Sequence, residues 1–345
     1  MLPSSRRFEV DHLHGTPKDL SDQKGNPVAA GARSDRPDRG PSFIFVGASR
    51  AGSSWFFEAL REHPQIFVPP NKGTLYFSRF HELGVDWYEG FFPAKPTGRT
   101  VGEVCEHYLS SAEALARIRD YRPNVRLICC IRNPYERALS AWRFFIRNGV
   151  GQPSLSAEGA QRPDIFSNGH YATQLTAMRD LFPAEQIHVI AYDDLVMSAA
   201  TVTRRLYEFV GADPNYVPST LNRRVNANAR PRSRVLAHVV HNLHMRSWGS
   251  SRWLSNAVGL VKRLQPVRRL VTSLLYKEDT QSSGWSAHLG EFPDSVIARY
   301  EAEISPLEKM LQRSFAHWRA PIGGVRPAAG EAAPVATARR AGVAP

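Results

Sequence analysis

Cysteine is scarce in this sequence, whose 345 residues include only Cys105, Cys129 and Cys130. Cys129 and Cys130 are neighbours whose side chains would point to opposite sides of an extended strand, so no disulfide framework can be drawn. The chain also lacks a run of about 18 apolar residues, which a membrane-spanning helix needs. No apolar stretch follows Arg6 and Arg7, as it would in a secretory signal. We therefore predict a soluble, cytoplasmic protein.

Large apolar side chains are few in residues 1–40, and residues 322–345 consist almost wholly of Ala, Gly, Pro, Val and Arg. Such segments bury too little surface to offset the loss of chain entropy, so both are predicted to be disordered tails. Residues 41–321 are predicted to form one domain. Its core can be large, because 42% of the chain is hydrophobic and 10% aromatic.

Acidic residues are absent from residues 214–277, which contain twelve Lys and Arg. The whole chain has 44 Lys and Arg against 32 Asp and Glu, so this segment alone accounts for the net charge of +12. Apolar residues recur in it at helical intervals, which predicts two basic amphipathic helices.

Three interpretations of this basic segment stay open. The helices could simply pack on the domain with a solvated basic face, or they could form a basic wall for an anionic ligand, with residues 230–234 as its strongest part. They could also associate with an anionic membrane surface. Nucleic-acid binding is not predicted, because no helix-turn-helix, zinc finger or aromatic stacking motif accompanies the charge.

Strands and helices alternate through the domain. Short apolar runs predict strands at residues 43–46, 66–68, 100–104, 125–131 and 187–192, and amphipathic patterns predict helices at 53–62, 134–147, 168–182, 197–210 and 293–314. This alternation predicts an α/β fold with a central, mainly parallel sheet flanked by helices on both faces.

A glycine loop, Gly47-Ala-Ser-Arg-Ala-Gly-Ser-Ser-Trp55, joins the first predicted strand to the first predicted helix. Free backbone N–H groups and the positive end of the helix dipole meet at such a turn, which favours phosphate binding. The spacing Gly47-x4-Gly52 matches the start of the ATP/GTP-binding P-loop, but Ser53 stands where that motif needs Lys. A kinase that uses ATP is therefore disfavoured, although Arg50 supplies a cation one turn earlier.

A second motif, Arg132-Asn-Pro-Tyr-Glu-Arg-Ala-Leu-Ser140, follows the strand predicted at 125–131. Pro134 is typical of the first turn of a helix. Arg132 and Ser140 could grip one oxyanion if the chain folds back, which the spacing alone does not establish.

Together the two motifs resemble those of the sulfotransferases that use 3′-phosphoadenosine 5′-phosphosulfate (PAPS), nearest to the bacterial and heparan-sulfate-type carbohydrate branch. The resemblance covers most of residues 41–321 and continues through Val68-Pro-Pro-x-Lys72, Gly84-x-Asp-Trp-Tyr88, Gly102-Glu103, Gly169-His-Tyr171, Asp193-Asp-Leu195 and Leu311-x6-Trp318. It implies a three-layer, P-loop-like fold, PAPS as donor and no metal. As acceptor it implies a hydroxyl group, on a glycan, a glycolipid or a small metabolite.

The resemblance also implies roles for particular residues. The loop would hold the 5′-phosphosulfate through Arg50, Ala51, Gly52, Ser53, Ser54 and Trp55, and Arg132 with Ser140 would hold the 3′-phosphate. Arg50 stands where most members carry Lys, and it would neutralise the charge that develops on the bridging oxygen of the leaving phosphate. Lys72 would contact the phosphosulfate or the substrate. His170 and Tyr171 would either line the acceptor cleft or pack in the domain.

Gly73 departs from the family pattern. The carbohydrate branch carries a catalytic Glu directly after a Lys, in Lys-Glu-x-x-Phe-Phe, whereas Gly73 follows Lys72 here. A general base is normally a carboxylate or His. We expect Glu103 first, at the end of a predicted strand, then His107 and Glu106, although each could instead be structural. The departure also leaves open a non-catalytic protein that binds PAPS or a glycan.

Overall fold

The computed structural model describes residues 40–92, 99–222, 229–231, 276–278 and 285–320. The two predicted tails, apart from Gly40, and most of the basic segment 214–277 lie outside these residues, including both predicted amphipathic helices.

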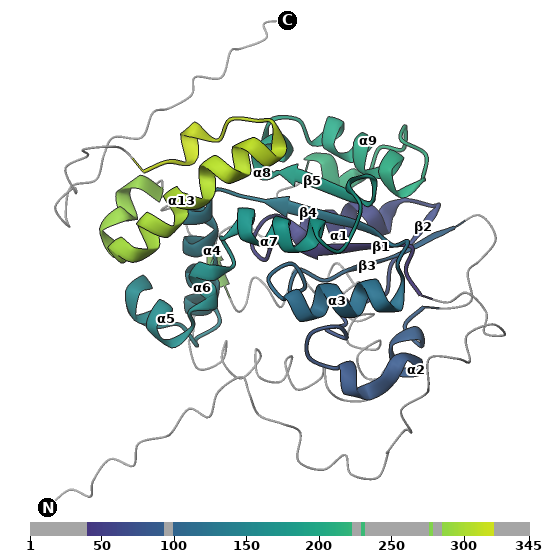
Figure 1. Ribbon diagram of the computed structural model, residues 1–345, viewed down its shortest axis with the longest axis horizontal. Coiled ribbons are helices and arrows are strands. Elements are labelled where there is room, and N and C mark those ends of the chain that lie inside the picture. Colours follow the sequence, from purple (N-terminus) through teal and green to yellow (C-terminus); the bar gives the residue numbers. More distant parts are fainter. Residues whose placement is uncertain (1–39, 93–98, 223–228, 232–275, 279–284, 321–345) are drawn as a thin grey trace, which may run out of the picture. The chain divides into compact units, whose positions relative to one another are not determined.

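Five parallel strands form the central sheet, in the order β2-β3-β1-β4-β5 (Figure 1). Their bounds are β1 Phe43–Gly47, β2 Ile66–Phe67, β3 Thr100–Val104, β4 Arg126–Ile131 and β5 Ile187–Ala191. Every residue of β1 is buried, as is typical of a parallel strand covered on both faces. The predicted α/β architecture is thereby confirmed.

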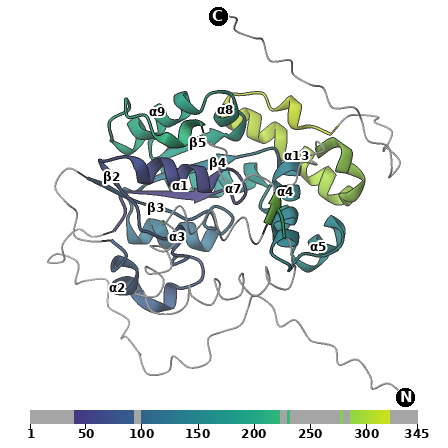
Figure 2. The same ribbon diagram turned by 180° about the vertical axis from the view of Figure 1, so that it is seen from behind.

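Helices cover both faces of this sheet. Helix α1 (Ser53–Glu62) lies on the face turned forward in Figure 2, and α3 (Ala112–Tyr121) and α7 (Tyr171–Arg179), which pack against each other, lie on the face turned forward in Figure 1. The other helices described are α2 Gly84–Glu89, α4 Pro134–Arg147, α5 Leu155–Gln161, α6 Asp164–Ser167, α8 Tyr192–Met197, α9 Ala199–Val210 and α13 Asp294–Leu311. Short 3₁₀ helices include η3 Ser219–Asn222, η4 Trp285–Glu291 and η5 Ala316–Trp318.

Local sequence explains where α4 begins. The side chain of Asn133 accepts hydrogen bonds from the backbone N–H groups of Tyr135 and Glu136, at 3.0 and 3.3 Å, and Pro134 occupies the first turn. The Asn133 side chain satisfies two donors that a helix otherwise leaves free at its start, and Pro134 has no N–H to satisfy. Arg132 is thereby held at the junction between β4 and α4.

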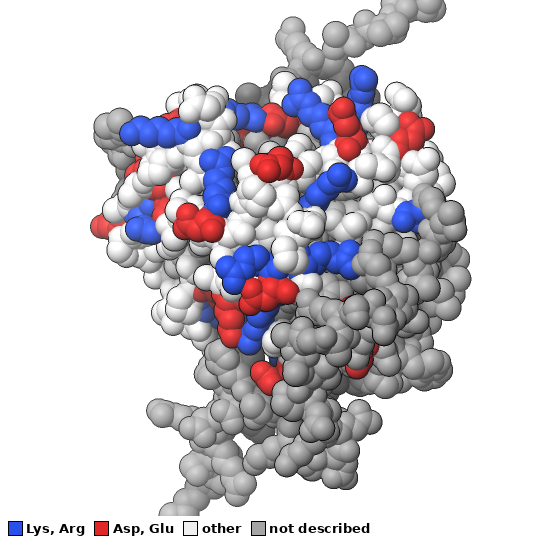
Figure 3. Space-filling view, turned by 45° about the vertical axis from the view of Figure 1, so that its right-hand side comes forward, with Lys and Arg blue, Asp and Glu red and all other residues white. Residues whose placement is uncertain are grey.

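Two short parts of the basic segment pair with each other, and one of them lies against α4. Strand β6 (Ala229–Pro231) pairs antiparallel with β7 (Tyr276–Glu278), placing Arg230 opposite Lys277, and β6 lies against α4. Elsewhere, Figure 3 shows Lys and Arg side chains interspersed with Asp and Glu on the described part of the face in view. This mixture agrees with the charge balance of the chain outside residues 214–277.

A close contact inside the sheet gives a stability prediction. Gly102 of β3 lies opposite Phe43 of β1, and a Cβ added there would come within 2.0 Å of the Phe43 ring. We expect Gly102→Ala to lower the free energy of unfolding by about 1–3 kcal/mol, because the packed ring must move. Urea denaturation measures this. Gly290→Ala is the control, since nothing lies within 4 Å of its added Cβ; equal midpoints for the two variants would contradict the prediction.

Candidate functional site

Three polar segments meet at one edge of the sheet, because the carboxyl ends of parallel strands lie together. The glycine loop follows β1, Glu106 follows β3 and Arg132 follows β4. Since β1 is the middle strand of these three, its loop lies between the other two segments.

The glycine loop has the geometry of an anion site. Gly52 is the N-cap residue of α1, with φ 87°, and makes no side-chain capping bond. Arg50 also has a positive φ, of 67°. The first N–H groups of α1 have no partner within the helix and lie at the positive end of its dipole. Ala51 and Ser53 are buried, whereas Ser54 is half-buried.

Arg50 joins this loop to α4. Its Nε donates to Ser140 Oγ at 3.3 Å, and its guanidinium carbon lies 4.8 Å from the centre of the Phe144 ring. Burial and, after it, neighbouring guanidiniums lower the pKa of Arg50 to about 10, although the Glu106 carboxylate opposes them. These guanidiniums belong to Arg147, Arg132 and Arg137. Because Arg50 lies near other positive charges, an anion bound beside it would stabilise its charged form.

Arg132 lies beside Arg50. Its Nε and Nη2 donate to Glu136 Oε2 at 3.0 and 2.9 Å, and its Nη1 lies 3.4 Å from the carbonyl oxygen of Arg50. Its guanidinium carbon lies 4.7 Å from the centre of the Tyr192 ring. The structure therefore brings together Arg50, Arg132 and Ser140 from the two sequence motifs.

Lys72 contacts the glycine loop from a third segment. Its ammonium donates to Ser53 Oγ at 3.0 Å and Ser54 Oγ at 3.3 Å, and it pairs with Glu106 Oε1 at 2.6 Å. Burial alone would raise the pKa of Glu106, but the charges of Lys72 and His107 outweigh it and hold the pKa at about 2. His107 itself is exposed beside this pair.

Glu103 lies in the core, contrary to its expected place in the site. Its side chain is fully buried, and its oxygens accept hydrogen bonds from Thr74 N, Thr74 Oγ1, Tyr108 Oη and Tyr88 Oη at 3.0, 2.6, 3.1 and 2.7 Å. An acceptor hydroxyl cannot reach this carboxylate, so the structure does not support Glu103 as the base. Instead it ties β3 to the segment that follows Lys72.

Tyr171 is likewise not placed as an acceptor contact. It is only 1% exposed, and its hydroxyl accepts a hydrogen bond from the backbone N–H of Arg132 at 3.3 Å. His170 is half-buried, with its ring 5.9 Å from that of Tyr300, and burial lowers its pKa. Trp55 packs inward, donating from Nε1 to the carbonyl oxygen of Thr220 at 3.2 Å.

Some residues of this region were missed by sequence reasoning. Tyr192, under the Arg132 guanidinium, directly precedes the Asp-Asp-Leu motif, which was the available signal. Glu136 lies within the second motif, and its i,i+4 spacing from Arg132 could have predicted the ion pair.

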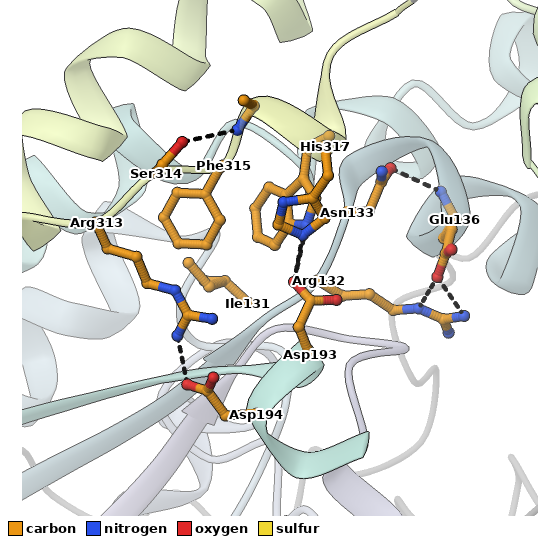
Figure 4. A network of polar contacts seen from close by, with 12 residues as sticks. Ile131, Arg132, Asn133, Glu136, Asp193, Asp194, Arg313, Ser314, Phe315 and His317 are labelled. Atoms are coloured by element: carbon orange, nitrogen blue, oxygen red, sulfur yellow. Dashed lines mark hydrogen bonds and ion pairs between the residues drawn. The ribbon is translucent and has the colours of Figure 1, made fainter. Parts of the chain in front are cut away.

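Residues 313–318 dock on α8, the helix that directly follows β5 (Figure 4). Asp193 Oδ2 accepts from His317 Nε2 at 3.0 Å and from Trp318 Nε1 at 2.9 Å, and Asp194 pairs with Arg313. These contacts place η5 next to α8, whose first residue is Tyr192.

The described residues contain neither a metal-binding cluster nor a membrane-spanning helix. No group of three or more His, Cys, Asp or Glu side chains there could hold a metal ion. Within the same residues, no helix combines the length and hydropathy of a membrane span.

The burial of Glu103 generates a prediction. Glu103→Ala should lower the free energy of unfolding by about 2–4 kcal/mol, because it leaves buried donors without an acceptor. Glu103→Gln should lower the free energy of unfolding much less, since its amide oxygen can still accept a hydrogen bond from Thr74. Denaturation by urea at pH 7 measures both.

The pH dependence of Glu103 has a defined sign. Burial raises its folded-state pKa above the ordinary 4.5, despite its hydrogen bonds. Its contribution to stability is therefore complete below pH 4.5 and is lost as the pH rises through the folded-state pKa. The Gln variant should lack this loss, and an identical stability profile from pH 4 to about 8 in both proteins would contradict the assignment.

Comparisons with known proteins agree with the motifs. The model of the family described as "Sulfotransferase family" matches residues 86–215. Mouse heparan sulfate glucosamine 3-O-sulfotransferase 6 is 29% identical over 195 residues, which cover 54% of this chain and 56% of that protein. Human bifunctional heparan sulfate N-deacetylase/N-sulfotransferase 3 is 27% identical over 202 residues, covering 52% of this chain and 23% of that protein. The chain thus spans little more than half of the first relative and a smaller part of the second.

One solved structure shares the fold over most of the chain. The crystal structure of a sulfotransferase from Alicyclobacillus acidocaldarius matches with a TM-score of 0.56 and 20% identity, covering 81% of this chain and 98% of that one. The family model and the curated relatives confirm the predicted resemblance to sulfotransferases, and the solved structure confirms the fold that it implied.

Proposed function

Because residues 86–215 match the model of the sulfotransferase family, we propose that this chain transfers the sulfuryl group of PAPS to a hydroxyl group of a carbohydrate acceptor. The observation that carries this proposal is the bond between the two motifs, from Arg50 Nε to Ser140 Oγ at 3.3 Å. This hydrogen bond places the glycine loop, which suits a phosphate, next to Arg132 and Ser140, which suit a second anionic group.

The residues present fit the two charged ends of PAPS. The glycine loop, Lys72 and the hydroxyls of Ser53 and Ser54 offer donors to the 5′-phosphosulfate. Arg132 and Ser140 offer donors to the 3′-phosphate. The neighbouring guanidiniums that, after burial, lower the pKa of Arg50 support the same assignment, because bound phosphates would offset the repulsion among them.

The reaction needs charge stabilisation from the protein. The acceptor oxygen attacks sulfur in line, and negative charge develops on the oxygen that leaves with the 5′-phosphate. A guanidinium fixed next to that oxygen stabilises the transition state. Arg50 is held for this role by Ser140 and by the face of Phe144.

The acceptor class is inferred from the relatives. Both named above act on heparan sulfate, which supports a glycan acceptor for this chain. A glycolipid or a small hydroxylated metabolite would use the same chemistry. Transfer of radiolabelled sulfuryl from PAPS to separate panels of polysaccharides, glycolipids and small alcohols distinguishes these acceptors.

We also propose a cytoplasmic location and the single domain 41–321. Cys105, Cys129 and Cys130 are buried, unpaired thiols, which suits a reducing compartment. Fractionation of the native host measures the location.

Binding of adenosine 3′,5′-bisphosphate tests the class directly. Calorimetry without added magnesium should show a single saturable site, since the proposed contacts are all made by side chains and backbone N–H groups. ATP, which lacks the 3′-phosphate, should bind much more weakly because it leaves Arg132 and Ser140 unused. Failure of the bisphosphate to bind would refute the proposed function.

Arg50 and Arg132 should separate turnover from binding. Arg50→Ala is expected to lower kcat by about 10²–10³-fold, because it removes transition-state stabilisation. Arg132→Ala should mainly weaken bisphosphate binding, by roughly 10–100-fold, as expected for a lost charge-assisted hydrogen bond. Arg119→Ala is the control, since Arg119 is exposed and pairs with Asp120. Equal effects of both variants on kcat and on binding would contradict the assigned roles.

A further inference from the structure

Lys72 is shared between a carboxylate and the glycine loop. Its ammonium lies 2.6 Å from Glu106 Oε1 and also donates to Ser53 Oγ and Ser54 Oγ. The side chains of Lys72 and Glu106 are 22% and 15% exposed, so the pair is partly shielded yet open to a ligand.

We propose that Glu106 is the general base of the transfer reaction and that Lys72 restrains it until the donor draws the ammonium onto the glycine loop. This inference rests on the proposed function. Lys72 already contacts both serine hydroxyls of the loop, so a small movement of its ammonium would exchange the carboxylate for the phosphosulfate.

The position of Glu106 favours it over the other two candidates. It follows β3, the strand next to β1, and its charge acts on Arg50, the residue placed at the leaving oxygen. Glu103 is fully buried and hydrogen-bonded on both oxygens. His107 is exposed and lies one residue further from β3.

The charges around Glu106 explain the restraint. Burial would raise its pKa, whereas Lys72 and His107 lower it to about 2, which makes it a weak base. Arg50 and the Cys105 thiol are its other titratable neighbours. When Lys72 turns to the donor, the effect of burial is no longer offset, and the donor's own negative charge acts in the same direction. The carboxylate then becomes basic enough to accept a proton.

The step balances without a further reactant. A Glu106 oxygen takes the proton of the acceptor hydroxyl as the acceptor oxygen forms a bond to sulfur. The bond from sulfur to the bridging oxygen breaks, and its electron pair stays on the 5′-phosphate of adenosine 3′,5′-bisphosphate. Glu106 afterwards releases the proton to water.

Glu106→Gln tests the base. It should lower kcat by about 10²–10⁴-fold, the usual contribution of a general base, while bisphosphate affinity changes less than about threefold. Glu106→Asp should recover part of kcat. Glu113→Gln, at an exposed carboxylate of α3, is the matched control and should leave kcat and affinity unchanged.

Proton uptake tests the restraint. Calorimetry with adenosine 3′,5′-bisphosphate at about pH 5, in two buffers of different ionisation enthalpy, counts the protons taken up on binding. The wild-type protein should take up more than Glu106→Gln, because the pKa of Glu106 rises on binding. Lys72→Met should remove this difference, since its Glu106 is not restrained beforehand, and Lys72→Arg should keep it.

The outcomes separate this inference from the proposed function. If the wild-type protein binds the bisphosphate and transfers sulfuryl while Glu106→Gln keeps full kcat, Glu106 is not the base. If proton uptake is equal in the wild type and Glu106→Gln, the restraint is overturned. Loss of bisphosphate binding by the wild-type protein would instead overturn the proposed function itself.

Discussion

The parallel pairing of β1 with β3 on one side and β4 on the other is the constraint on which the rest of the structure depends. It sends three chain segments out at the same edge of the sheet, and none of the contacts around Arg50 could form without that convergence. Because all five residues of β1 are buried, the edge is set by the hydrophobic core rather than by the charged residues themselves. The guanidiniums are held together against their mutual repulsion by packing energy supplied elsewhere.

Local signals in the sequence were sufficient for much of the fold. The helices expected at 53–62 and 134–147 coincide with α1 and α4, because Gly52 and the Asn133-Pro134 pair mark where each begins. Helix α3 was missed although Ser111 caps it, since only a few apolar side chains follow at helical spacing. Boundaries shifted by a few residues at the helices predicted over 168–182, 197–210 and 293–314, which the structure bounds as α7 Tyr171–Arg179, α9 Ala199–Val210 and α13 Asp294–Leu311.

The candidate site was predictable only where it consists of contiguous motifs. Arg50, Arg132 and Ser140 come from two such motifs, and the structure places them in contact. The environment of Glu103 was not predictable, because its partners Thr74, Tyr88 and Tyr108 come from separate segments. The sequence does not show whether a carboxylate at the end of a strand lies in an open site or accepts hydrogen bonds from buried hydroxyl groups. Only tertiary packing distinguishes the two.

The support of Arg132 extends to the last described turn of the chain. Its backbone N–H donates to Tyr171, whose ring lies 6.3 Å from that of Trp318, and Trp318 is held by Asp193. The edge of the sheet that carries Arg50 and Arg132 is therefore a long-range assembly rather than a module of the first hundred residues of the domain. The contact of Trp318 with Tyr171, which supports Arg132, can form only after the ribosome has synthesised the chain through η5. A nascent chain that ends before η5 therefore contains both motifs but lacks one of the contacts that position Arg132.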